Sequence, residues 1–181
     1  MTVWVAFLRG INVGGKHSVP MKALVAGLQT NGIAEVKTYI QSGNLVFRSD
    51  KSKSALAKTI AQVIENDFGF LPKVLVLSAK ELAQAVAANP YAKAVADGTP
   101  ESGKTVHLWF LTEPSKKPDL AALTTLKAAS EDFALHGQVL YLFAPNGIGR
   151  SKFAEKVDKH LGVETTARNW NTISKVLELA T

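Results

Sequence analysis

Polar and charged residues gather near the start of the chain in a pattern that could bind an anion. Arg9 precedes the segment GINVGGK at residues 10–16, so Arg9 and Lys16 flank a loop with three glycines. An apolar run comes before this loop, and Pro20 opens an amphipathic segment after it. A glycine-rich loop between a strand and a helix can direct backbone N–H groups at one point, and the helix N-terminus adds positive potential. The pattern predicts a site for a phosphate or a carboxylate.

The loop matches only part of the phosphate-binding loop of nucleotide hydrolases. The spacing from Gly10 to Lys16 fits G-x-x-x-x-G-K, but His17 stands where that motif has Ser or Thr to hold magnesium. The order of segments further along the chain also differs from that of a parallel nucleotide-binding sheet. We therefore expect an anion cradle of another kind. The alternative is a surface loop whose glycines only allow turns.

Two further polar segments are candidates for the same site. Ser42 and Asn44 flank a glycine at a predicted strand end, and Arg168 and Asn169 precede the last predicted helix. Such positions can turn donors toward a ligand. We predict one anion-binding cleft formed by Arg9, Asn12, Lys16, Ser42, Asn44, Arg168 and Asn169. The alternative is a structural clasp, in which Asn169 caps the helix and the arginines bond backbone carbonyl groups.

A second glycine loop, NGIGRSK at residues 146–152, enters another predicted helix. The simplest interpretation is that Ser151 or a neighbour caps this helix. Arg150 and Lys152 would also suit an anion, because they stand at the positive end of the helix dipole.

Positive charge is concentrated in the first part of the chain. The net charge is +6, and residues 1–77 hold nine Lys/Arg against four Asp/Glu, with no acid before Glu35. Residues 133–154 and 165–177 are also free of acids and contain Arg150 and Arg168. If these stretches meet in space they form a patch that attracts anions, whereas a general solubilising charge would need no partner.

Several function classes lack support in the sequence. The four histidines have no metal-ligand spacing, there is no G-x-S-x-G elbow, and no pair of carboxylates suggests acid–base catalysis. We expect no metal site and no cofactor. No apolar run approaches the ~20 residues of a membrane helix, so we expect no membrane association. The lack of cysteines and of a signal peptide leads us to expect a cytoplasmic protein.

The hydrophobic periodicity predicts an α+β fold made of two similar halves. Strands are predicted at residues 2–8, 36–41, 45–48 and 73–77, and helices at residues 20–30 and 52–68. This is the β-α-β-β-α-β order of ferredoxin-like units. Strands at residues 105–111, 132–135, 138–143 and 163–167, with helices at residues 118–128 and 151–161, repeat the order. Two further helices are predicted, at residues 78–88 and 169–179.

This pattern predicts two ferredoxin-like halves in tandem with a linking helix and a C-terminal helix. The predicted domains are residues 1–77, a linking helix and loop at residues 78–104, and residues 105–181 with the added helix. The apolar positions of each element give the predicted core. In the first half these are Phe7, Leu24, Leu28, Ile40, Phe47, Ile60, Ile64 and Val76, and in the second Leu108, Leu123, Leu140, Phe153 and Val157.

Five blocks of the sequence resemble a bacterial family of uncharacterised proteins, the domain of unknown function 1697. They are FLRGINVGGK (7–16), VPM (19–21), TYIQSGNLVF (38–47), GRSK (149–152) and TARNWNT (166–172). The resemblance spans nearly the whole chain. It implies an α+β arrangement of two ferredoxin-like halves, and it implies no particular activity, substrate or catalytic residue.

Three function classes follow from these features. The favoured hypothesis is a protein that binds a phosphate-bearing small molecule or nucleotide in a basic cleft. A nucleic-acid-binding protein is an alternative, although neither half has the aromatic stacking motif of RNA-recognition domains. An enzyme acting on a phosphorylated substrate is the third, with Arg9, Lys16 and Arg168 as electrostatic stabilisers.

Overall fold

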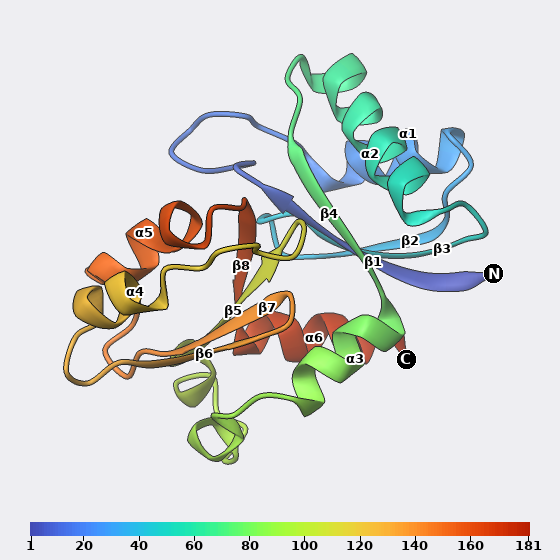
Figure 1. Cartoon of the computed structure of the whole chain (residues 1–181). Helices are drawn as coiled ribbons and strands as arrows, with labels where there is room; N and C mark the ends of the chain where they lie inside the picture. Colours follow the sequence, from blue (N-terminus) through green and yellow to red (C-terminus); the bar gives the residue numbers. More distant parts are fainter. The chain divides into compact units, whose positions relative to one another are not determined.

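The first sheet is organised around β1 (Thr2–Arg9), the strand that precedes the glycine-rich loop. The computed structural model describes all residues, Met1–Thr181, and its first sheet has the strand order β2-β3-β1-β4 (Figure 1). The other strands are β2 (Ala34–Tyr39), β3 (Asn44–Ser49) and β4 (Lys73–Ser78), and every neighbouring pair is antiparallel. β1 pairs with a strand at each edge, and the centre of its apolar run, residues 5–8, is buried.

Two helices pack on this sheet, α1 (Met21–Thr30) and α2 (Lys53–Phe68). Ser52 caps α2 by accepting a hydrogen bond from the backbone N–H of Ala55, and Gly69 ends the helix at φ +80°. Their apolar stripes form one core cluster with alternate residues of the strands. Of the predicted core, Leu24, Leu28, Phe47, Ile60, Ile64 and Val76 lie in this cluster.

Two predicted core residues of the first half lie elsewhere. Phe7 is buried, but Ala6 and Leu8 are the β1 residues that face the helices, so Phe7 lies on the other face of the strand. Ile40 is 52% exposed at φ +49°, and its predicted burial is wrong. β2 ends at Tyr39, so Ile40 belongs to the turn and no longer follows the alternation of the strand.

The second sheet has the strand order β6-β7-β5-β8 and is also antiparallel throughout. Its strands are β5 (Val106–Leu111), β6 (Asp132–His136), β7 (Val139–Phe143) and β8 (Thr165–Asn169). β8 begins two residues later than the predicted strand at residues 163–167. The chain order of strands and helices repeats that of the first sheet, as the sequence periodicity predicts.

Helices α4 (Leu120–Leu126) and α5 (Lys152–Leu161) pack on one face of the second sheet. Their core cluster contains the predicted Leu123, Leu140, Phe153 and Val157. Leu108 is fully buried but lies opposite Tyr141 on the other face, where the Tyr141 hydroxyl donates to the carbonyl oxygen of Ala85 at 2.8 Å. The whole of β5 is buried, so its apolar sequence does not indicate which face meets the helices.

The chain divides into two compact units. One comprises Met1–Gln84 with Ser174–Thr181, and the other comprises Ala85–Ile173. The division falls within α3 (Ala79–Ala87) and α6 (Trp170–Ala180), and two short 3-10 helices, η1 (Ala92–Val95) and η2 (Ser102–Lys104), precede β5. The predicted domain limits at residues 77 and 105 stay a prediction. The fold is mixed α+β, with two four-stranded antiparallel sheets and six α-helices.

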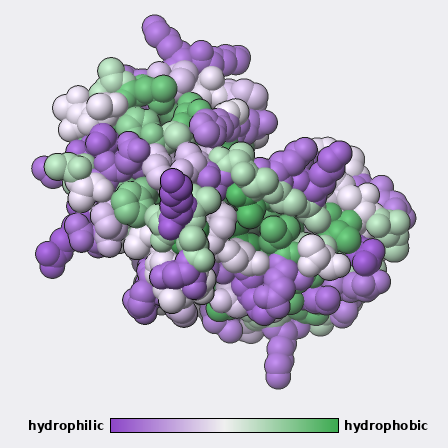
Figure 2. Space-filling view, turned by 90° about the horizontal axis from the view of Figure 1, so that it is seen from below, coloured by the Kyte–Doolittle hydropathy of each residue, from purple (hydrophilic) through white to green (hydrophobic).

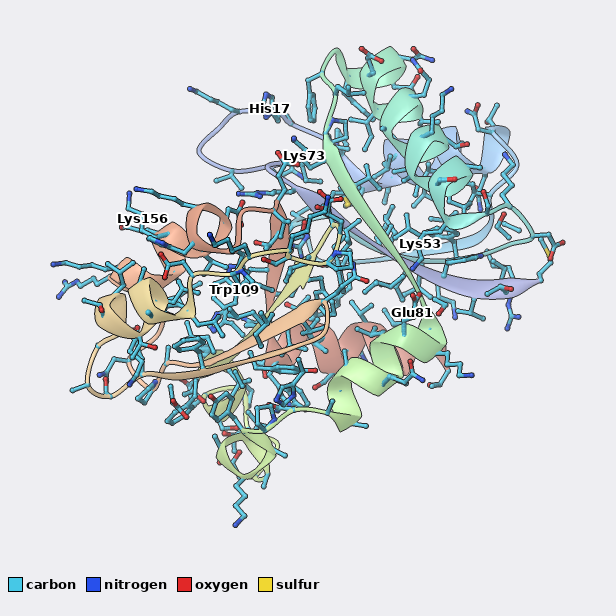
Figure 3. All side chains as sticks on the ribbon, viewed as in Figure 1. His17, Lys53, Lys73, Glu81, Trp109 and Lys156 are labelled. Carbon is cyan, nitrogen blue, oxygen red and sulfur yellow. The ribbon has the colours of Figure 1, made fainter.

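The start of α3 has a capping box. The carboxylate of Glu81 accepts from the backbone N–H of Ser78 at 2.8 Å, and the Ser78 hydroxyl accepts from the N–H of Glu81 at 3.2 Å. Lys53 adds an ion pair to Glu81 at 2.6 Å, linking the first turn of α2 to α3 (Figure 3).

Figure 2 shows one face of the molecule, on which hydrophilic side chains project around hydrophobic residues. None of the helices combines the length and the apolar character that crossing a membrane requires.

Candidate functional site

The glycine-rich loop forms a tight hairpin. Val13 and Lys16 form an isolated antiparallel bridge, and the N–H of Lys16 donates to the carbonyl oxygen of Val13 at 3.1 Å. Gly14 and Gly15 lie between them at φ +60° and +72°, as a two-residue turn with positive φ at both central positions requires. The glycine pair that resembled part of a phosphate-binding loop is therefore used to reverse the chain.

The amide of Asn12 holds this hairpin to its surroundings. Its Nδ2 donates to the carbonyl oxygens of Val19 at 3.0 Å and Gln41 at 2.8 Å, while its Oδ1 accepts from the N–H of Val19 at 2.8 Å. The residue has φ +52°, a conformation that asparagine tolerates better than most residues. Both ends of the amide thus have protein partners within the first unit.

The turn before β3 belongs to the same network. Asn44 is buried, and its Nδ2 donates to the carbonyl oxygen of Tyr39 at 2.9 Å and to the hydroxyl of Ser42 at 3.0 Å. The N–H of Leu8 donates to the carbonyl oxygen of Gly43 at 2.8 Å. The structure therefore brings Asn12, Ser42 and Asn44 together at one end of the first sheet.

The two predicted cations of the first unit, Arg9 and Lys16, lie at the same end. Arg9 is the last residue of β1, opposite Lys73, the first residue of β4. Beside Lys16, the ring of His17 stacks on Phe70 with a centroid distance of 4.3 Å (Figure 3). The Nδ1 of His17 lies 3.0 Å from the carbonyl oxygen of Gly10. Because a carbonyl oxygen can only accept, Nδ1 carries the proton.

Arg168 and Asn169 belong to the second unit, at the end of β8. The Oδ1 of Asn169 accepts from the N–H of Thr172 at 3.0 Å and so caps α6, which agrees with the simpler interpretation of this residue. The Nη1 of Arg168 donates to the carbonyl oxygen of Ala167 at 2.8 Å. Burial lowers the pKa of the Arg168 guanidinium to about 10, so the side chain keeps its charge at neutral pH. The seven predicted site residues thus divide into five of the first unit and two of the second, and their joint cleft stays a prediction.

The second unit contains an open cavity beside the start of α5. Its volume is about 590 Å³, and its wall consists of the end of α4, the turn before β6, the loop after β7 and the first residue of α5. The lining residues are Leu126, Ala128, Ser130, Glu131, Asn146, Gly147, Gly149, Arg150, Ser151 and Lys152. The sequence indicates the loop at residues 146–152 by its glycines and cations, but it does not predict the surrounding cavity.

Local hydrogen bonds shape the loop that carries these cations. Gly147, at φ +75°, donates its N–H to the carbonyl oxygen of Ala144 at 2.9 Å. The Ser151 hydroxyl accepts from the N–H of Ala154 at 3.1 Å, which confirms its expected role as helix cap. Arg150 and Lys152, on either side of this cap, are both exposed. The cap and the turn therefore bring two exposed cations to the cavity rim.

Glu131 supplies an acidic group to a wall that is otherwise neutral or basic. It is only 6% exposed, and its Oε2 accepts from the N–H of Ala128 at 2.8 Å. Lys127 donates from Nζ to the backbone carbonyl oxygen of Glu131 at 2.8 Å, which closes the same turn. Sequence reasoning missed Glu131, because one glutamate beside one aspartate has no spacing that distinguishes it from surface acids.

The comparisons with known proteins identify a family and a fold. A family model described as "Protein of unknown function (DUF1697)" matches residues 1–141. The chain is similar to the structure of "conserved bacterial protein SP0830 from Streptococcus pneumoniae", with 23% identity, 99% of each chain covered and a TM-score of 0.71. At this identity the similarity shows the fold alone. A search of the curated proteins finds no match.

Proposed function

The chain belongs to the DUF1697 family of proteins of unknown function, and we propose that it binds a phosphate-bearing small molecule in the cavity beside α5. The observation that carries this proposal is the cavity itself, with Arg150 and Lys152 in its wall. Its volume of about 590 Å³ lies within the range of small-molecule sites, roughly 300–1,000 Å³.

The charge distribution around the cavity favours an anion. Residues 133–154 contain no acid, so Arg150 and Lys152 have no acidic neighbour along this segment. They flank the start of α5, a helix of ten residues, where the helix dipole adds positive potential. Neither cation forms an ion pair with the protein. An anionic ligand would therefore gain two charge-assisted hydrogen bonds without breaking an existing one.

The polar groups of the wall fit the same kind of ligand. Ser130 and Asn146 face each other across the cavity wall, with 3.4 Å between Asn146 Nδ2 and Ser130 Oγ. This long contact is a weak hydrogen bond, so a ligand can replace it at little cost. The amide and the hydroxyl would orient a bound molecule, as a few well-placed polar groups do in other small-molecule sites.

The topology of each unit supports a finer description of the fold. We infer that both units have the ferredoxin-like arrangement. In each unit the chain runs strand–helix–strand twice. Within each sheet the four strands, numbered by their order in the chain, lie side by side in the order second, third, first, fourth. In each unit the two helices of this pattern pack on one face, which is the layer arrangement of that fold.

Binding measurements on purified protein test the ligand class. Phosphate esters should raise the thermal midpoint and bind in titration calorimetry, and Arg150→Ala with Lys152→Ala should weaken binding about tenfold or more. Lys156→Ala is the matched control, because Lys156 lies on the same helix without lining the cavity (Figure 3). Equal loss in the control, or no binding of any phosphate ester, would contradict the proposal. Displacement by an oligonucleotide, with steep salt dependence, would favour the nucleic-acid alternative.

The predicted residues of the first unit are tested in the same assay. Arg9→Ala and Lys16→Ala should leave the affinity unchanged if the cavity beside α5 is the site. A loss of affinity in these variants alone would instead favour the glycine-rich loop as the anion site, and the cavity would be the wrong location.

A further inference from the structure

The carboxylate of Glu131 adds a hydrogen-bond acceptor to the cavity wall that contains Arg150 and Lys152. The residue lines the cavity while only 6% of its surface is exposed, so its position is determined by its surroundings. Its Oε2 is held by the N–H of Ala128. A carboxylate can accept hydrogen bonds at both oxygens, and no protein group donates to Oε1. This leaves one fixed acceptor for a bound molecule.

The same carboxylate limits which anions fit. A negative charge in the wall repels a ligand whose groups are all anionic acceptors, because like charges brought together in a partly buried site destabilise a complex. A ligand that meets both Glu131 and the cations must therefore have an anionic end and a hydrogen-bond donor. The cavity volume of about 590 Å³ also exceeds what a free phosphate ion fills.

We propose that the ligand is a monophosphate ester that bears hydroxyl groups, a sugar phosphate or a nucleoside monophosphate. Its phosphate is bound by Arg150 and Lys152, and one of its hydroxyls donates to Oε1 of Glu131. This inference rests on the proposed function and specifies the ligand class for the same cavity. The amide of Asn146 and the hydroxyl of Ser130 are the remaining polar groups for the sugar.

A comparison of four ligands in the unchanged protein tests the inference. Ribose 5-phosphate should bind about tenfold more tightly than n-propyl phosphate, which has the phosphate but no hydroxyl. Inorganic phosphate should bind no better than n-propyl phosphate. A nucleoside monophosphate distinguishes the two proposed ligand classes. If it binds more tightly than ribose 5-phosphate, the ligand is a nucleotide; if it binds more weakly, the ligand is a sugar phosphate.

The variant Glu131→Gln tests the role of the carboxylate. Its amide oxygen can still accept from Ala128, so the turn is retained while the charge is lost. Affinity for ribose 5-phosphate should fall about tenfold, and affinity for n-propyl phosphate should stay the same or rise. Glu155→Gln is the control, since Glu155 lies in the first turn of α5 and does not line the cavity.

The outcomes separate this inference from the proposed function. Equal binding of ribose 5-phosphate and n-propyl phosphate would overturn the role of Glu131 while leaving the phosphate site in place. No binding of any ester would overturn both. If Glu131→Gln does not fold, as judged by circular dichroism, the ligand comparison in the unchanged protein still decides.

Discussion

The side-chain amide of Asn12 donates a hydrogen bond of 2.8 Å to the backbone carbonyl oxygen of Gln41. This bond joins the glycine-rich hairpin after β1 to the turn before β3, two segments that the sequence separates by a helix and a strand. The same amide also accepts from the N–H of Val19 and donates to its carbonyl oxygen. Asn12 therefore positions both loops at this end of the first sheet.

Asn12→Ala should destabilise the first unit. The substitution leaves the carbonyl oxygen of Gln41 and the N–H of Val19 without their partners, and alanine is strained at φ +52°. We expect a loss of about 1–3 kcal/mol in the free energy of unfolding, measured by urea denaturation. Asn66→Ala is the control, because exposed Asn66 only accepts from Gln62 on the same helix. Equal stability of the two variants would show that the Asn12 network contributes little.

Gly43→Ala should be more damaging than Gly10→Ala. Both glycines have nearly the same φ, +78° and +77°, so the backbone strain is matched. A Cβ at Gly43 would lie 2.6 Å from the Cβ of Leu8, whereas a Cβ at Gly10 meets nothing within 4 Å. We expect about 1 kcal/mol for Gly10→Ala from strain alone and about 1–3 kcal/mol more for Gly43→Ala from overpacking. Similar thermal midpoints for the two variants would disprove the close packing of the turn.

Ile40→Asn should stabilise the protein. Ile40 is 52% exposed at φ +49°, where a β-branched side chain is strained and asparagine is tolerated. The expected gain in unfolding free energy is about 1 kcal/mol. Val13→Asn is the matched control. Val13 is also β-branched and exposed, at 66%, but its φ is not positive. A loss of stability in Ile40→Asn would mean that the isoleucine side chain has a packing role.

His107 should make the stability of the protein depend on pH. Burial lowers its pKa from 6.5 to about 4. Between these values the unfolded chain binds a proton that the folded chain does not. Stability therefore falls as pH decreases from 6.5 to 4 and does not depend on this group above 6.5. The full effect is about 3 kcal/mol at pH 4.

Urea denaturation as a function of pH checks the role of His107. His107→Phe should remove much of the slope between pH 6.5 and 4, because phenylalanine has no proton to bind. His136→Gln, at an exposed position, should keep the slope. An unchanged slope in His107→Phe would assign the acid sensitivity to other groups.

The order of strands and helices could be predicted because it depends on local patterns. The stripe of Leu56, Ile60 and Val63 identifies α2 without knowledge of its partner, since a helix buries one face wherever it packs. Helix ends were also predictable, because Ser52 and Gly69 act on backbone groups within a few residues. The beginning and end of most elements agree with the sequence for this reason.

The orientation of β5 depended on tertiary structure. Every residue from Val106 to Leu111 is buried, so alternation could not show whether Leu108 or Trp109 meets the helices. The predicted burial of Ile40 is wrong for a related reason. Strand alternation places Ile40 in the core, but β2 ends at Tyr39, one residue before it. Periodicity determines which residues alternate, but it does not determine where the strand stops or what covers each face.

The sequence by itself determined the elements, their order and the segments rich in glycine and cations. Tertiary structure decided how those segments are used. Gly14 and Gly15 turn a hairpin, Asn12 joins two loops, and Glu131 meets the loop at residues 146–152 across a cavity. Turn-forming and anion-binding glycines have the same sequence pattern, because both need a backbone without a Cβ. The approach of an acid from one loop to cations of another depends on packing between distant segments, and no local spacing encodes it.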